Sequence, residues 1–125
     1  MTGDLTTAAI RPFIPGGNDY ELSKRFYAAL GFTMTFDAGE VSGWKCDSGE
    51  FLLQNYFHEG WAHNFMMHLT VEDLDAWWAH IQSLDLPGKF GVQAPKPPKM
   101  QPWGLVISYV YGPCGELWHV AQKRP

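Results

Sequence analysis

The sequence has few cysteines, few charges and no long apolar run, and each shortage excludes a class of protein. Cys46 and Cys114 are too few for a disulfide framework, so we expect reduced thiols that pack. Nine scattered basic residues against 13 acidic ones, a net charge of -4, argue against nucleic acid as a partner. No apolar run has the about 20 residues of a membrane span, and residues 1–9 lack the pattern of a signal peptide. We therefore expect a cytoplasmic protein with no membrane partner.

Aromatic residues are abundant instead. Six tryptophans, five tyrosines and eight phenylalanines make up 15% of the 125 residues, whereas charged residues make up 18%. A hydrophobic share of 46% predicts one folded domain with a core of modest size. Aromatic rings both fill cores and line binding sites, so the excess predicts either a dense core or an aromatic-lined pocket.

The first half of the chain has the pattern of a strand, a helix and three more strands. Leu22, Phe26 and Ala29 recur at helical spacing, and Asn18 or Asp19 can cap the start of that helix. Periodicity predicts that Phe26 packs in the core. The predicted strands are residues 8–14, 32–36, 41–46 and 51–57.

The same order of elements returns in the second half. A second amphipathic helix, residues 72–84, has Leu74, Trp78 and Ile81 on one face, and we expect Trp78 to be a core residue. Residues 94–102 contain four prolines and predict a rigid extended loop without regular structure. The predicted strands are residues 64–71, 105–111 and 116–122, with a further short strand near residues 90–93.

Two short matches support a duplication. Gly49-Glu50 and Gly115-Glu116 each precede an apolar strand at the end of a half. Together with the repeated order of elements, this predicts two βαβββ modules, residues 8–58 and 64–122. One module offers too little surface for its own core, so we expect an α+β domain in which both modules form a cup-shaped mixed sheet with helices outside.

The C-terminal third carries a resemblance to a known family. The run Gln101-Pro102-Trp103-Gly104, followed by a strand, a Gly112-Pro113-Cys114-Gly115 turn and a last strand containing His119, resembles bleomycin resistance proteins. These belong to the glyoxalase/bleomycin resistance/dioxygenase (vicinal oxygen chelate) superfamily, and the resemblance extends over essentially the whole chain. Two departures stand out: Gly112 replaces the usual Asp, and this chain is less acidic than the bleomycin-binding members.

The resemblance implies a homodimer whose ligand lies in a cleft lined by aromatic side chains. Trp103 matches the tryptophan of the motif, Phe36 matches a second aromatic wall, and His68 falls where those relatives carry Trp on the fifth strand. Strand parity and the crossover loop add three further candidates. The predicted ligand-binding residues are Trp103, Phe36, His68, His119, Gln54 and Trp61.

Enzymes of the superfamily hold a divalent ion with His and Glu side chains from both modules. Carried onto this chain, their positions fall at Pro12 or Phe13, at Leu53 or Gln54, at Met66 and at His119. Of these only His119 has a ligating imidazole or carboxylate. His68, two residues after Met66, shares its face, so His68 and His119 either bind a metal weakly or serve as hydrogen-bonding and packing residues. We expect no metal and no other cofactor.

Three functions follow as hypotheses. The first is a non-catalytic protein that sequesters a planar aromatic or glycopeptide-like small molecule. The alternative is a metal-dependent glyoxalase, dioxygenase or thiol-transferase type of enzyme with a non-standard ligand set. The third is an interaction domain whose aromatic residues form only a dimer interface. No serine or cysteine comes with a recognisable base, and no glycine-rich phosphate loop is present, which favours the first hypothesis.

Overall fold

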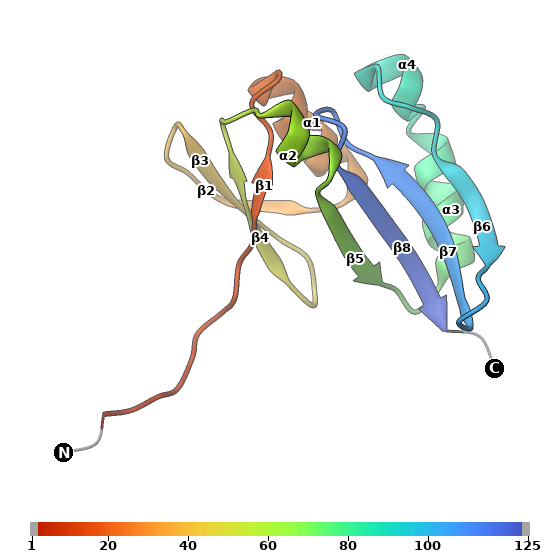
Figure 1. Ribbon diagram of the computed structural model, residues 1–125, viewed down its shortest axis with the longest axis horizontal. Coiled ribbons are helices and arrows are strands. Elements are labelled where there is room, and N and C mark those ends of the chain that lie inside the picture. Colours follow the sequence, from red (N-terminus) through yellow and green to blue (C-terminus); the bar gives the residue numbers. More distant parts are fainter. Residues whose placement is uncertain (1–2, 124–125) are drawn as a thin grey trace.

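Eight strands and four helices follow one another in residues 3–123, the part of the chain that this computed structural model describes (Figure 1). In chain order they are β1 (Phe13–Pro15), α1 (Tyr20–Leu30), β2 (Thr33–Asp37), β3 (Val41–Lys45), β4 (Glu50–Gln54), α2 (Glu59–His63), β5 (Met66–Thr70), α3 (Leu74–Ser83), α4 (Leu86–Phe90), β6 (Lys96–Met100), β7 (Leu105–Tyr111) and β8 (Leu117–Lys123).

The strands form two four-stranded sheets with the same internal order. The first sheet runs β1-β4-β3-β2 and the second runs β5-β8-β7-β6 (Figure 1). In the first sheet β1 is parallel to its neighbour β4, and in the second β5 is parallel to its neighbour β8; the other neighbouring strands are antiparallel. The predicted α+β fold with a repeated arrangement is confirmed, with the eight strands divided equally between the two sheets.

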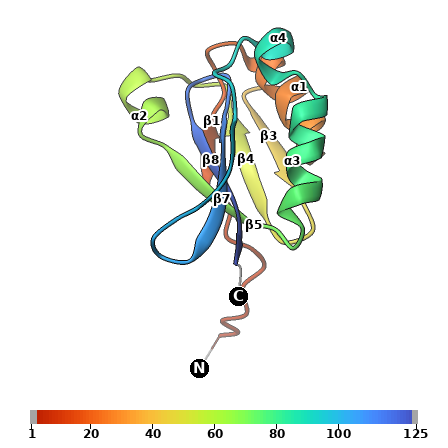
Figure 2. The same cartoon turned by 90° about the vertical axis from the view of Figure 1, so that its right-hand side faces the viewer.

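Helices α1, α3 and α4 lie on one side of the sheets, and the short α2 lies on the other (Figure 2). Alternate strand residues face the three helices: Phe51 and Leu53 on β4, and Trp118 and Val120 on β8, are all buried in one core. The residues between them emerge on the opposite side, which we call the open face of each sheet. Within residues 3–123 no helix has the length and apolarity to cross a bilayer.

Aromatic rings join the two halves of the chain in this core. The Trp118 ring centroid lies 5.3 Å from that of Phe32 and 5.8 Å from those of Tyr27 and Phe51. Trp118 comes from the second sheet, whereas its three partners belong to the first half of the chain. Neither half therefore has a complete core without the other.

A buried carboxyl group lies at the same junction. Glu116 has no exposed surface, and its carboxylate accepts hydrogen bonds from the Tyr27 hydroxyl at 2.7 Å and from the Cys114 backbone N–H at 2.9 Å. The Trp118 indole N–H donates to the Tyr27 oxygen at 3.0 Å. Burial raises the pKa of Glu116, which the bond from Tyr27 partly offsets. This network links α1 to the start of β8.

The start of α1 is as predicted, but its buried face is rotated. The Asp19 side chain accepts a hydrogen bond from the Leu22 N–H at 3.2 Å, which caps the helix. Phe26 is fully buried as expected, together with Tyr27 and Leu30, while Leu22 is only half-buried. Hydrophobic spacing did not predict that Tyr27 is buried, because a tyrosine side chain is only partly apolar. Its hydroxyl has a buried hydrogen-bond partner here.

Residues 94–102 correct the sequence prediction of an irregular loop. Lys96–Met100 forms β6, which pairs with β7 at the edge of the second sheet. An edge strand needs hydrogen bonds on one side only, and the ladder is interrupted by a bulge between Lys96 and Lys99, where Pro97 and Pro98 lie. Prolines are tolerated at both kinds of position, so their number was a poor argument against a strand.

Three other predicted boundaries also change. No strand forms at residues 90–93; Phe90 ends α4, in which the Asp85 side chain accepts from the Gly88 N–H, and residues 91–93 are irregular. The first strand begins at Phe13, because residues 3–11 are exposed and lie away from the sheets (Figure 1). The fourth strand ends at Gln54 and is followed by α2. Trp78, which we expected to be a core residue, is half-buried and packs against the core.

Candidate functional site

Two histidines lie side by side on the open face of the second sheet. Trp118 and Val120 point into the core, so His119, between them, points the other way. The register pairs His119 with His68 on β5 and with Tyr109 on β7. The ring centroids of His68 and His119 are 6.0 Å apart, and Tyr109 meets His119 edge-to-face at 4.9 Å.

His119 holds a polar atom without a partner. Its Nε2 is buried and forms no hydrogen bond with any described residue. Burial lowers the pKa of His119, and the neighbouring His68 lowers it further. The imidazole is thus kept mainly neutral near pH 7, and one of its nitrogens is available to a ligand group that can reach it.

The donor set does not fit the divalent-metal site of the superfamily's enzymes. Such a site needs three or more protein ligands that converge with open coordination positions. Nowhere in residues 3–123 do three His, Cys, Asp or Glu side chains come together in this way. The family positions for further ligands fall at Pro12 or Phe13 and at Leu53 or Gln54 in the first half of the chain, and none of these residues has an imidazole or a carboxylate.

The middle of the open face of the first sheet is apolar. The register aligns Phe13 with Leu52 and Leu52 with Gly43, and the Phe36 ring lies directly over Gly43. A side chain at position 43 would occupy the space of that ring, so this glycine is what seats Phe36. Phe13 remains 45% exposed and Phe36 40% exposed. Gln54 follows Leu52 on the same face.

Trp103 lies at the tip of the β6–β7 hairpin. Its indole is 63% exposed, and the turn is closed by the Gly104 N–H, which donates to the Gln101 carbonyl at 3.0 Å. Tyr109 is four residues beyond Leu105, where β7 begins, so the turn is about 13 Å along the strand from the Tyr109–His119 row. Trp103 and His119 therefore lie at separate places on one sheet.

Trp61 is placed on α2. Its ring contacts Tyr56 and Phe65 at centroid distances of 5.8 Å each, so it packs within a small aromatic cluster. Of the six predicted residues, the structure brings His68 and His119 into contact. Phe36 and Gln54 share the face of the other sheet, and Trp103 and Trp61 stand apart from both groups.

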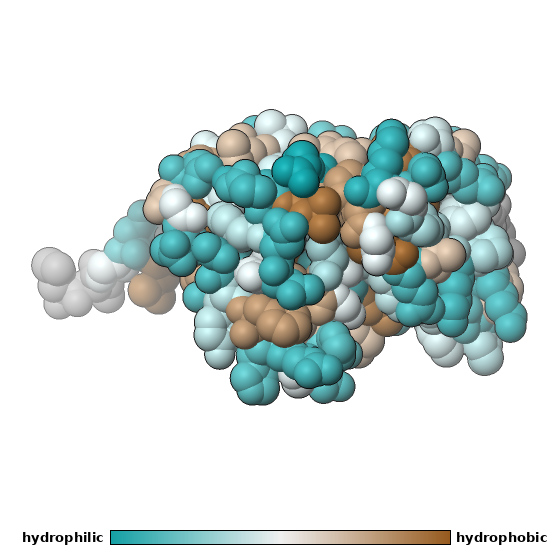
Figure 3. All heavy atoms as spheres, turned by 90° about the horizontal axis from the view of Figure 1, so that it is seen from above, coloured by the Kyte–Doolittle hydropathy of each residue, from teal (hydrophilic) through white to brown (hydrophobic). Residues whose placement is uncertain are grey.

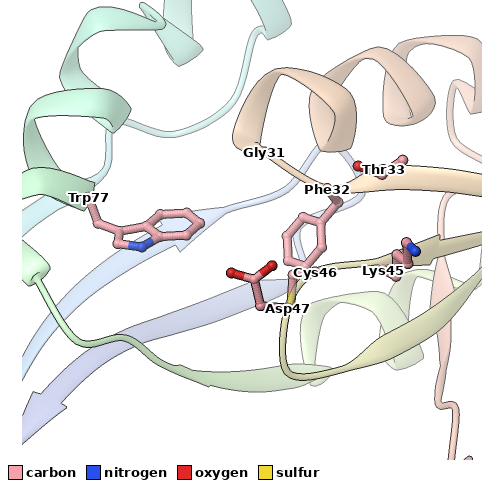
Figure 4. A pocket seen from close by; sticks show the side chains of 7 residues that line it. All are labelled: Gly31, Phe32, Thr33, Lys45, Cys46, Asp47 and Trp77. Carbon is pink, nitrogen blue, oxygen red and sulfur yellow. The ribbon is translucent and has the colours of Figure 1, made fainter.

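A hollow that sequence reasoning missed opens between α3 and the first sheet. Figure 4 shows the Trp77 and Phe32 rings and the Asp47 carboxylate around one cavity of about 410 Å³, beside Cys46. A neighbouring cavity of about 310 Å³ has His68 in its wall, together with Glu50 and Trp118. Helical spacing would place Trp77 beside the core stripe of Leu74 and Ile81, where a pattern search cannot distinguish packing from lining.

The two cysteines are free thiols with different surroundings. Cys114 is buried, and burial raises its pKa to about 11, so this thiol is protonated and unreactive near neutral pH. Cys46 is partly exposed at the wall of the hollow and lies 3.8 Å from the Ser48 hydroxyl. Neither is held by an imidazole base.

Comparison with solved structures gives close fold matches at low sequence identity. A bleomycin-binding protein solved with bleomycin has a TM-score of 0.78 and 21% identity, over 94% of this chain and 100% of the other. An antibiotic-binding protein from a Streptomyces species has a TM-score of 0.74 and 20% identity, over 97% and 100%. The sequence matches no protein-family model and no curated protein.

This chain has the bleomycin-resistance and glyoxalase fold. The fold also includes a lactoylglutathione lyase from Agrobacterium tumefaciens, with a TM-score of 0.67 and 16% identity over 94% of this chain and 95% of the other. Both binding proteins and an enzyme thus share the bleomycin-resistance and glyoxalase fold, so the side chains on the open faces must distinguish between the two functions.

Proposed function

We propose that this chain sequesters a planar aromatic small molecule without catalysing a reaction on it. The observation that carries the proposal is the pair of open sheet faces, which expose aromatic rings and imidazoles in the place of a metal-ligand set. Two of the solved structures with this fold are of proteins that bind bleomycin and an antibiotic, which supports the same role.

We further propose that Trp103, Phe36, His68, His119, Gln54 and Trp61 contact the ligand. Exposed rings such as Phe36 and Trp103 can stack on a flat ligand, and each such contact adds about 1 kcal/mol beyond the burial of area. The amide of Gln54 and the unpartnered Nε2 of His119 can orient it through hydrogen bonds.

Trp103→Ala is expected to weaken binding about tenfold, or about 1.4 kcal/mol, because the variant loses a stacking surface. The indole is 63% exposed, so its removal should leave the fold intact. Binding is measured by fluorescence titration with the neutral dye N-phenyl-1-naphthylamine and by calorimetry with bleomycin. Met34→Ala is the control, because Met34 is 45% exposed and pairs with core-facing Trp44 on the helix side of the first sheet; it should keep the wild-type affinity. An unchanged affinity in Trp103→Ala would remove this residue from the site.

A homodimer would bring open faces from two copies together, and we propose that the chain forms one. Phe13 and Phe36 on the first sheet and Met66 on the second are between 40% and 62% exposed, and contact between two copies would remove these apolar side chains from water. The end of the molecule seen from above, in contrast, is mostly hydrophilic, with apolar side chains only in small separate groups (Figure 3).

Met66→Glu is expected to weaken the dimer by more than about tenfold, because a carboxylate would be buried without a partner. Sedimentation velocity over a range of protein concentrations measures the effect. Met100→Glu is the control, since Met100 is 52% exposed on the edge strand β6 but pairs with core-facing Val106. A wild-type chain that remains monomeric at every concentration would contradict the dimer.

A further inference from the structure

Charge is distributed unevenly between the two sheets. The four strands of the second sheet contain no Asp or Glu, although the whole chain has 13 such residues and a net charge of -4. The same strands contain three lysines and two histidines. These five residues are Lys96, Lys99, Lys123, His68 and His119.

All five side chains leave the sheet on its open face. Residues opposite each other on neighbouring strands share a face, and the register pairs Lys96 with Tyr109, which in turn pairs with His119. His119 pairs with His68, so one row of Lys96, Tyr109, His119 and His68 crosses the whole sheet.

Two further lysines flank that row. Lys99 lies opposite Ile107 and Lys123 opposite Leu105, and both partners lie on the same side of β7 as Tyr109. We call these five residues the basic face. Each lysine is exposed, so its ammonium group can move to meet a ligand.

Nearby carboxylates leave the basic face largely unneutralised. Glu116, at the start of β8, is turned into the core, where Tyr27 and the Cys114 N–H occupy its oxygens. Glu50 shares the wall of one cavity with His68, at the end of the row away from Lys96. The centre of the row, with the unpartnered Nε2 of His119 beside the Tyr109 ring, faces no strand carboxylate from its own sheet.

From this geometry we propose that the ligand is an aromatic anion: a flat ring system that carries a carboxylate, sulfonate or phosphate group. The acidic group binds along the row of Lys96, Tyr109, His119 and His68, and the rings lie against the exposed aromatic side chains. The inference rests on the proposed sequestering function and specifies the chemistry of its ligand. Charge-assisted hydrogen bonds to an anion are about twice as strong as neutral ones, which makes the charge decisive for selectivity.

A matched pair of fluorescent probes tests the charge requirement. 8-Anilino-1-naphthalenesulfonate and N-phenyl-1-naphthylamine share the same ring system and differ by one sulfonate. The measured quantity is the ratio of their affinities, which cancels contributions from stacking. In the double variant Lys96→Gln/His119→Phe, the affinity for the sulfonate dye divided by the affinity for the neutral dye should fall about tenfold. This corresponds to the loss of roughly one charge-assisted hydrogen bond.

Lys89→Gln is the control for a general change in charge, because Lys89 lies on α4 away from the basic face; it should leave the ratio unchanged. If both dyes bind but the ratio is the same in the double variant, the anion inference is wrong and the sequestering function stands. A ratio that falls equally in Lys89→Gln would also overturn it, as a non-specific effect of charge. If the wild-type protein binds neither dye, the proposed function fails together with the inference.

Discussion

Trp118→Ala is expected to lower the free energy of unfolding by about 4 kcal/mol, a large part of the stability of a domain of this size. The indole is 2% exposed and lies between rings that belong to the other half of the chain. Its removal leaves a cavity at the junction and takes away the N–H that donates to Tyr27. Denaturant unfolding followed by circular dichroism measures the change.

Trp118→Phe separates the two causes. Phenylalanine keeps most of the packing but cannot donate a hydrogen bond, so it should cost clearly less than alanine, about 2 kcal/mol. Trp103→Ala, at an exposed position, should change stability by less than about 0.5 kcal/mol. A Trp118→Ala protein as stable as the Trp103→Ala protein would show that the two halves do not depend on this junction.

Glu116→Ala is expected to cost about 3 kcal/mol at pH 5, because it leaves the Tyr27 hydroxyl and the Cys114 N–H buried without their acceptor. Glu116→Gln keeps an acceptor oxygen and similar volume, so its loss should be smaller. Thermal or urea unfolding of the three proteins under the same conditions gives the order. If alanine and glutamine cost the same, the lost hydrogen bonds are not the cause.

The same carboxyl group should give stability a dependence on pH. Burial raises the pKa of Glu116 in the folded chain above its ordinary value of 4.5, so the folded state retains a proton that the unfolded chain releases. The stabilising contribution is therefore fully present below pH 4.5 and is lost as pH rises through the folded pKa. Subtracting the stability of Glu116→Gln at each pH cancels other groups, and the difference should fall over this window. A difference that rises with pH would contradict the assignment.

The elements were predictable where one local pattern decided them. The buried Phe26 follows from helical spacing, and the sequence narrowed the cap to Asn18 or Asp19, of which the structure uses Asp19. The edge strand β6 was not predictable in this way. A sequence window cannot show that a strand will lie at an edge, where Pro97 and Pro98 break no ladder on the outer side.

The candidate site was predictable only in part. Parity along one strand placed His119 on the face away from the core, and the same rule applied to β7 would have found Tyr109. Contacts between strands depend on register, which the sequence did not give, so the row from Lys96 to His68 could not be assembled beforehand.

The junction explains one departure from the resembling family. Gly112, where those proteins usually have Asp, lies against the Glu116 carboxylate, and a side chain there would have no room. Glycine at position 112 therefore leaves the space that the Glu116 carboxylate occupies. A sequence pattern shows the two residues separately and gives no sign that they compete for the same space.

The proline-containing edge of the second sheet also bears on how concentrated solutions of this protein should behave. A sheet that ends in a regular strand can take on a strand from another molecule, and such additions lead to aggregates. At β6 the adjacent Pro97 and Pro98 have no N–H to offer, and the exposed Lys96 and Lys99 repel a second positively charged edge. The opposite sheet ends in β2, whose five residues are all exposed and include no proline. Of these two edges, intermolecular strand pairing should therefore begin at β2, and the β6 edge of the second sheet should be protected from it.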